Sequence, residues 1–211
     1  MLPLSRVRAL DFGIRALALA ALLSPAGCGS GDQPPGEPAT PRGQPSEPAG
    51  ACNAVTQSFD VPSALHQTDC SPLPDSSKPP SGGDHYGTWA AFQSYAFPIP
   101  HGFLIHSMEH GAVIVYYNCP SGCANEVAEV QSFLDSQPED PLCLGQSTLR
   151  RAVLTPDPTL DVRWAMSAWG ETLRADCFDS RAFGSFYQAH YGHGPEQLCN
   201  AGAAFNAPPC E

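Results

Sequence analysis

Apolar and polar residues follow different patterns along the second half of the chain. Residues 112–117 are almost all apolar, which is typical of a strand buried on both faces of a sheet. In residues 124–136, apolar side chains recur at helical spacing before a proline ends the pattern. Residues 150–155 and 162–169 have the composition of strands and are separated by a proline-rich turn. These four segments predict the order β-α-β-β.

A second helix is expected over residues 179–191, because Asp179 or Ser180 can cap its first turn and aromatic side chains share one face. Upstream of the first strand the chain is rich in loops, and only residues 88–96 show a helix-like spacing of aromatic side chains. The full order is β-α-β-β-α after a loop-rich lead-in. It favours an α+β fold, in which residues 51–211 form a single domain with one sheet and packed helices.

The first 27 residues have the features of an export signal. Three arginines precede an apolar stretch over residues 16–23, and small residues then lead to a cysteine. The sequence Ala26-Gly27-Cys28 is similar to a bacterial lipobox, which predicts a lipoprotein-type signal peptide over residues 1–27 and a membrane anchor on acylated Cys28. Cleavage after Ala26 by the ordinary signal peptidase is the alternative.

The number of cysteines favours the lipoprotein interpretation. The chain has nine, and acylation of Cys28 leaves eight, an even number that can pair completely in an oxidising compartment. The simplest short-range disulfides are Cys52–Cys70 and Cys199–Cys210. A zinc site made of thiolates is less favoured, because only Cys119 and Cys123 are closely spaced.

Composition limits the classes of partner. Residues 28–50 are rich in proline and glycine without an apolar period, so we expect a tether. The formal charge of −11 and the ten basic residues argue against a nucleic-acid-binding surface. No apolar run reaches the ~18 to 20 residues of a transmembrane helix. The sequence therefore predicts an acidic, exported domain held at a membrane by a lipid.

Potential metal ligands are most concentrated in residues 106–110. In a helix, His106, Glu109 and His110 would share a face, as in the inverted H-x-x-E-H zinc peptidases. In an extended chain, His106, Met108 and His110 would point to one side, and two imidazoles with a thioether favour copper. Prolines lie just upstream and a glycine follows directly, which leaves little room for a helix, so the extended conformation is favoured.

A second histidine-bearing loop leads to a family resemblance. The motifs in chain order are PPSGGDHY with His85, Trp89, HSMEHGAVIVYY, SAWG, Asp176 and Pro195-Glu196. Together they resemble the bacterial domain-of-unknown-function 3105 family over about residues 78–196, with Gly82 where that family usually has serine. The resemblance implies an exported or membrane-anchored domain and directs attention to the histidines and the glutamate of these motifs. It implies no mechanism.

The candidate metal ligands are His85, His106, Met108, Glu109 and His110. We expect a lipid-anchored protein of the cell envelope that binds a metal ion, copper before zinc, and that contacts the membrane and an envelope protein but no nucleic acid. One alternative is a structural or interaction module without enzymatic activity, and a less favoured one is a metal-dependent hydrolase with Glu109 as general base. No pattern supports His66 or His101, and His190 with His193 is interpreted as a surface pair.

Overall fold

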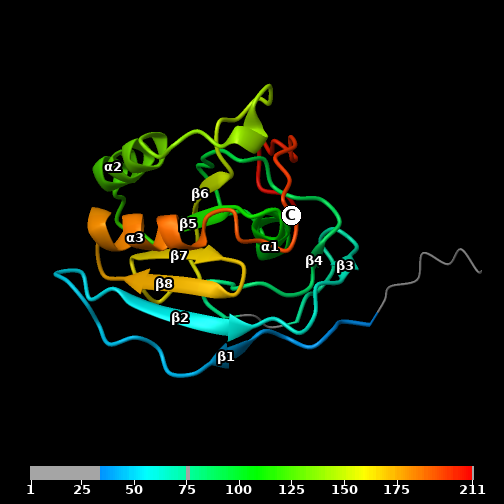
Figure 1. Ribbon diagram of the computed structural model, residues 1–211, viewed down its shortest axis with the longest axis horizontal. Coiled ribbons are helices and arrows are strands. Elements are labelled where there is room, and N and C mark those ends of the chain that lie inside the picture. Colours follow the sequence, from blue (N-terminus) through cyan, green and yellow to red (C-terminus); the bar gives the residue numbers. More distant parts are fainter. Residues whose placement is uncertain (1–33, 75–76, 211) are drawn as a thin grey trace, which may run out of the picture. The chain divides into compact units, whose positions relative to one another are not determined.

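The computed structural model describes residues 34–74 and 77–210. Within these residues it has three α-helices, a short 3-10 turn and eight strands (Figure 1). The helical elements are α1 (His101–Glu109), α2 (Ala124–Asp135), α3 (Ser180–His190) and the 3-10 turn η1 (Pro141–Cys143). The strands are β1 (Thr40–Arg42), β2 (Val55–Asp60), β3 (His66–Gln67), β4 (His85–Tyr86), β5 (Val113–Tyr117), β6 (Ala152–Pro156), β7 (Trp164–Ala168) and β8 (Glu171–Ala175).

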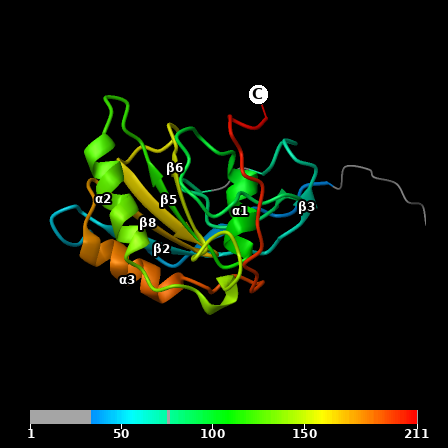
Figure 2. The same cartoon turned by 90° about the horizontal axis from the view of Figure 1, so that it is seen from above.

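Six of the strands form one mixed sheet in the order β1-β2-β8-β7-β5-β6, and β3 pairs with β4 separately. Strand β5 runs parallel to β6, whereas the other neighbours in the large sheet are antiparallel. Helices α2 and α3 lie on one side of the sheet and α1 on the other (Figure 2). Alternate residues of β5 therefore face different cores, Val113 and Val115 toward α2 and α3, and Ile114 and Tyr116 toward α1.

The periodic segments of the sequence form the predicted elements, and the α+β fold is confirmed. The apolar run became β5, and residues 124–136 and 179–191 became α2 and α3. The side chain of Asp179 caps α3 by accepting hydrogen bonds from the backbone N–H groups of Arg181 and Ala182. None of the helices in the described part of the chain is both long and apolar enough to span a bilayer.

The helix-like spacing of aromatic residues in residues 88–96 does not correspond to a helix. This segment is irregular, because its backbone groups bond to distant parts of the chain instead of to each other. The N–H of Ala91 donates to the carbonyl of Ala203, and the N–H of Tyr95 donates to that of Leu154. The aromatic side chains of this segment still pack in the core beside α1. Their spacing therefore reflects burial and does not indicate a helix.

Part of the expected tether belongs to the sheet. Within residues 28–50, strand β1 pairs antiparallel with β2, so that Thr40 lies opposite Asp60. Further upstream, the backbone N–H of Gly36 donates to Asp84 at 2.7 Å. The predicted signal peptide and Cys28 lie outside the described residues.

Eight cysteines form four disulfides, as the even count predicts, but both expected pairs are wrong. The disulfides are Cys52–Cys177, Cys70–Cys210, Cys119–Cys123 and Cys143–Cys199. Three of them join residues at least 56 positions apart because the sheet brings distant segments together. Pairing of β2 with β8, for example, places Cys52 beside Cys177, and the N–H of Asp176 donates to the carbonyl of Cys52.

Candidate metal centre

The segment expected to be extended is the C-terminal half of helix α1, so that prediction is wrong. The helix begins directly after Pro100 and ends at Glu109, and Gly111 then adopts a φ of +87°. Proline is compatible with the start of a helix and glycine with the residue after its end, so both residues bound the helix and do not prevent it. Residues 102–109 are all buried, which explains how a helix of only nine residues is stable.

The helical conformation separates Met108 from the histidines. In a helix, His106 and Glu109 are three residues apart and share a face. Met108 lies within the apolar core between α1 and the sheet and is fully buried there. Met108 is therefore absent from the donor cluster, contrary to the sequence prediction.

Four side chains from three elements meet beside the C-terminal half of α1. They are His66 of β3, His85 of β4, and His106 and Glu109 of α1, and their nearest donor atoms all lie within 4.8 Å of one another. The Oε2 atom of Glu109 is 3.0 Å from Nε2 of His85, 3.4 Å from Nε2 of His66 and 3.9 Å from Nε2 of His106. We call this group the four-residue cluster.

Residue His66, which the sequence motifs missed, enters the cluster through strand pairing. Strands β3 and β4 are parallel, and His66 is the direct partner of His85 in their register. Asp84 holds the pair together, because its carboxylate accepts hydrogen bonds from the backbone N–H of Leu65 and from the side chain of Gln67. Local sequence patterns cannot predict this contact, because the two histidines are 19 positions apart.

Two of the three histidine rings are oriented by hydrogen bonds at their Nδ1 atoms. Nδ1 of His85 lies 2.9 Å from the carbonyl of Gly83, and Nδ1 of His106 lies 2.7 Å from that of Tyr86. Because a carbonyl can only accept, each Nδ1 carries the proton and a neutral ring presents a lone pair at Nε2. This arrangement, with Nδ1–H on a carbonyl and Nε2 free, is the one that orients metal-ligating histidines.

Two donor atoms at the centre of the cluster are buried without a hydrogen-bond partner, namely Nε2 of His85 and Oε2 of Glu109. They are 3.0 Å apart, but their geometry is not that of a hydrogen bond. The side chains of His85, His106 and Glu109 are at most 8% exposed, whereas that of His66 is 55% exposed. Leaving buried polar atoms unpaired is costly, and a cation between them would remove this cost.

The ionisation states suit a cation site. Burial lowers the pKa of His106 to about 4, and the neighbouring imidazoles add to this effect against the hydrogen bond to Tyr86. Burial alone would raise the pKa of Glu109, but the contact with His85 and the charges of the three histidines lower it overall. At neutral pH the cluster therefore offers a carboxylate and, at His106, an uncharged imidazole.

The remaining histidines lie outside this cluster. His110, which follows α1, forms a second group with Glu109 and Glu196. His101 begins α1 and pairs with Asp157 at 2.8 Å, away from both groups. Neither group includes His190 or His193.

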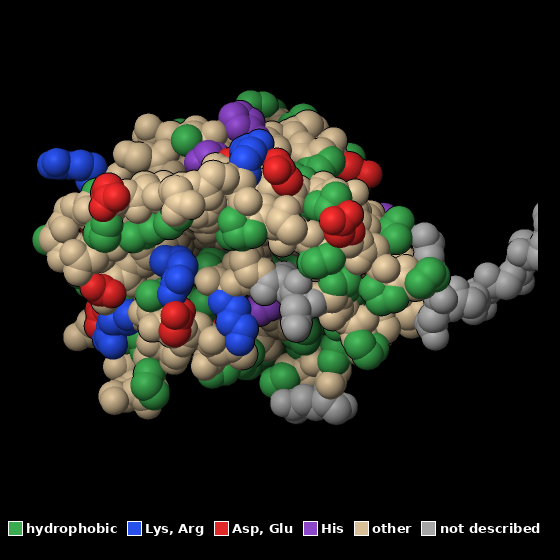
Figure 3. Space-filling model, turned by 90° about the horizontal axis from the view of Figure 1, so that it is seen from below, with side chains coloured by type: hydrophobic (Ala, Val, Ile, Leu, Met, Phe, Trp, Pro, Cys, Tyr) green, Lys and Arg blue, Asp and Glu red, His purple; other side chains and the backbone are tan. Residues whose placement is uncertain are grey.

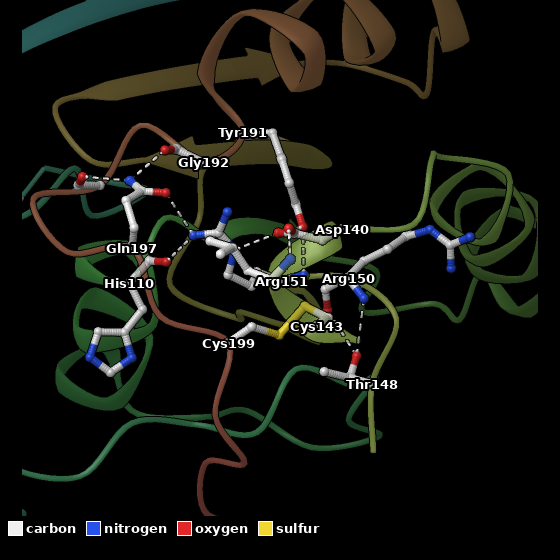
Figure 4. Close-up of polar contacts among 12 residues, drawn as sticks. His110, Asp140, Cys143, Thr148, Arg150, Arg151, Tyr191, Gly192, Gln197 and Cys199 are labelled. Atoms are coloured by element: carbon white, nitrogen blue, oxygen red, sulfur yellow. Dashed lines mark hydrogen bonds and ion pairs between the residues drawn. A yellow bond between two sulfur atoms is a disulfide. The ribbon is translucent and has the colours of Figure 1, made fainter. Parts of the chain in front are cut away.

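A polar network centred on the buried side chains of Arg151 and Asp140 contacts the end of α1 (Figure 4). Arg151 donates from Nη1 to the carbonyl of His110 and from Nε to Asp140, at 2.5 and 2.8 Å. Asp140 also accepts from the hydroxyl of Tyr191, and Arg151 donates to Gln197. The network fixes the end of α1, where Glu109 and His110 lie.

Charged side chains form no continuous basic patch on the face that Figure 3 shows. There, lysine and arginine side chains are interspersed with acidic ones. The ion pairs agree with this mixing, since Arg163 pairs with Glu126 and Arg174 with Asp161. This face has none of the charge separation on which binding to a phosphate backbone depends.

The fold and the cluster define a class, namely disulfide-bonded α+β domains with a buried His/Glu group that could hold a metal ion. Residues 66–202 match the model of a family described as "Protein of unknown function (DUF3105)". The chain therefore belongs to this family, which confirms the resemblance and extends it upstream to His66. No curated protein and no solved structure shows significant similarity to the chain.

Proposed function

We propose that this protein binds a divalent transition metal ion in the four-residue cluster, as a protein of the cell envelope. The distances from Oε2 of Glu109 to the three Nε2 atoms, 3.0 to 3.9 Å, carry the proposal. Neighbouring ligands of a tetrahedral zinc ion with bonds of ~2.0–2.1 Å are ~3.3 Å apart. The four donors are thus spaced as ligands of one ion.

Zinc is the first choice of metal and copper the second. The sequence favoured copper because Met108 would supply a thioether ligand. Met108 lies in the core, so that reason no longer applies. Three imidazoles and a carboxylate suit Zn²⁺ and Cu²⁺, whereas Cu⁺ prefers sulfur. We place Zn²⁺ first because the 3.0 to 3.9 Å distances from Oε2 of Glu109 lie around the ~3.3 Å expected between ligands of a tetrahedral zinc ion.

Retention and exchange of the ion fit the cluster better than hydrolysis does. Four protein donors complete a tetrahedral shell, whereas catalytic zinc sites keep one position for water. Three of the ligands are buried, and only His66 faces solvent to any extent. An ion would enter and leave by way of His66, which is the arrangement expected for storage or delivery.

Cobalt can test this site. One equivalent of Co²⁺ should give the intense visible absorption of a four-coordinate N/O site in the wild-type protein, and none in a His106→Ala variant. Met108→Leu is the matched control, because it changes the neighbouring residue at nearly constant volume and should keep the spectrum. Failure of the wild-type protein to bind Co²⁺ and Zn²⁺ more tightly than micromolar would rule out the proposal.

Four disulfides support an oxidising, exported location, because such bonds persist outside reducing compartments. We propose that acylated Cys28 anchors it there, since the eight other cysteines are all paired with one another. Expression of Cys28→Ser should move the protein from the membrane fraction to the soluble fraction. If the wild-type protein is already soluble, the ordinary signal peptidase cleaves it and the anchor is absent.

A further inference from the structure

A second group of donors lies beside the four-residue cluster and shares Glu109 with it. Its members are Glu109, His110 and Glu196, whose donor atoms lie within 4.8 Å of one another. Nε2 of His110 is 3.3 Å from Oε2 of Glu196. The His110 side chain is 2% exposed and that of Glu196 is 48% exposed, so this group opens to solvent on one side.

Backbone hydrogen bonds between the end of α1 and the segment that contains Glu196 position the second group. The N–H of Glu196 donates to the carbonyl of Glu109 at 2.9 Å, and the N–H of Gly192 donates to that of Gly111. Between these contacts, a Cβ on Gly194 would lie only 2.2 Å from the Glu109 carbonyl oxygen, so that only glycine permits such close packing.

His110 is fixed equally well. Its carbonyl accepts from Arg151, whose guanidinium also donates to Gln197 on the same segment as Glu196 (Figure 4). Its ring packs edge to face against Trp89 and His106, with centroids 4.6 Å away in both cases. His110 and Glu196 therefore face each other from two segments of the chain, and Arg151 joins these segments by hydrogen bonds.

From this arrangement we infer that Glu109 is a bridging ligand between two metal ions. The inference rests on the proposed function, because the first ion occupies the four-residue cluster. Oε2 of Glu109 faces the three imidazoles of that cluster, which leaves the second carboxylate oxygen for an ion bound by His110 and Glu196. In two-metal sites the ions are ~3.5–4 Å apart.

The charge and the donor count of the second group agree with a second dication. The four-residue cluster contains one carboxylate, and Glu196 adds another where the second ion would lie, which limits the positive charge of the pair. Three protein donors leave at least one coordination position to water. The second ion would thus be the more exposed and the more easily lost of the two.

The number of bound ions tests the bridge. After equilibrium dialysis against micromolar Zn²⁺, elemental analysis should find two ions per wild-type chain and one in Glu196→Gln. The control Glu129→Gln, which changes an exposed glutamate of α2, should keep two. Loaded with two equivalents of Cu²⁺, the wild-type protein should show the half-field electron paramagnetic resonance signal of a coupled pair, and Glu196→Gln should not.

Each result distinguishes this inference from the proposed function. One zinc ion per wild-type chain, with no coupled copper signal, overturns the bridge and leaves the four-residue cluster as a mononuclear site. Two ions in both the wild type and Glu196→Gln also overturn it, because the second ion then binds elsewhere. No ion in the wild type overturns both.

Discussion

Saturating Zn²⁺ should raise the unfolding temperature of the wild-type protein by about 10 °C. A ligand present at ~1,000 times its dissociation constant stabilises the folded state by ~4 kcal/mol, and each kcal/mol shifts the midpoint by ~2–4 °C in a domain of this size. The ligands come from β3, β4 and α1, which are separate in sequence, so unfolding would disperse them and release the ion.

The double variant His85→Gln/His106→Gln should lose most of the shift with zinc, because only the more exposed group of Glu109, His110 and Glu196 remains intact. Both side chains offer an Nε2 atom to the cluster, and two remaining donors bind a divalent ion weakly. His101→Gln is the control, since His101 lies on the same helix but pairs with Asp157 outside the cluster. Differential scanning calorimetry with and without zinc measures all three proteins.

The alternative from the sequence, a module in which the histidines are only structural, predicts the opposite pattern. In that case the double variant unfolds at a lower temperature than the wild type, and zinc changes neither protein. A shift of wild-type size in His85→Gln/His106→Gln would also contradict our assignment, because the stabilising ion would then bind outside the four-residue cluster.

Replacement of Arg151 by methionine should lower the free energy of unfolding by about 3–5 kcal/mol. Arg151 and Asp140 are both buried and 2.8 Å apart, and removal of one member of a buried ion pair leaves the other charge without compensation. The variant also loses the hydrogen bond to the carbonyl of His110 at the end of α1. Urea unfolding at neutral pH gives the size of the effect.

Arg42→Met is the matched control. Arg42 also contacts two acidic residues, Asp60 and Glu171, but its side chain is 58% exposed. Exposed ion pairs contribute only ~0–1 kcal/mol, because water and salt screen them. Equal losses in the two variants would show that burial of the Arg151 pair has no energetic consequence.

The difference between the wild type and Arg151→Met should also depend on pH. Burial raises the pKa of Asp140, but hydrogen bonds from Tyr191 and the N–H of Leu142, together with the bond and charge of Arg151, lower it overall. A carboxyl with a lowered pKa in the folded state contributes stability above its ordinary pKa of 3.8, and loses it as the pH falls through the lowered value. The stability difference should therefore shrink as the protein is acidified below about pH 4.

Local patterns predicted the elements whose apolar residues repeat with the period of the strand or helix that buries them. The sequence of β5 is apolar on both faces because the strand lies between two cores, and α2 and α3 each bury one stripe against the sheet. Helix α1 escaped prediction because Pro100 and Gly111 were interpreted as helix breakers. They are its boundaries, and burial stabilises the short helix between them.

The site was predicted only in part, because it depends on contacts between distant segments. His85, His106 and Glu109 were found from their motifs, whereas His66 joins them through the pairing of β3 with β4. Met108 was included because an extended chain would align it with His106, and the helix turns it into the core. The disulfides escaped for the same reason, since the sheet and not sequence proximity brings their cysteines together.

The hydrogen bond between Gly36 and Asp84 has a consequence for where a bound ion could go. Asp84 directly precedes His85, so Gly36 lies beside the four-residue cluster. Eight residues lead from Cys28 to Gly36, and even a fully extended chain of ~3.6 Å per residue would span at most ~29 Å. If Cys28 is acylated, the end of the domain that carries the four-residue cluster remains close to the lipid surface, so an ion bound there would be released next to that membrane.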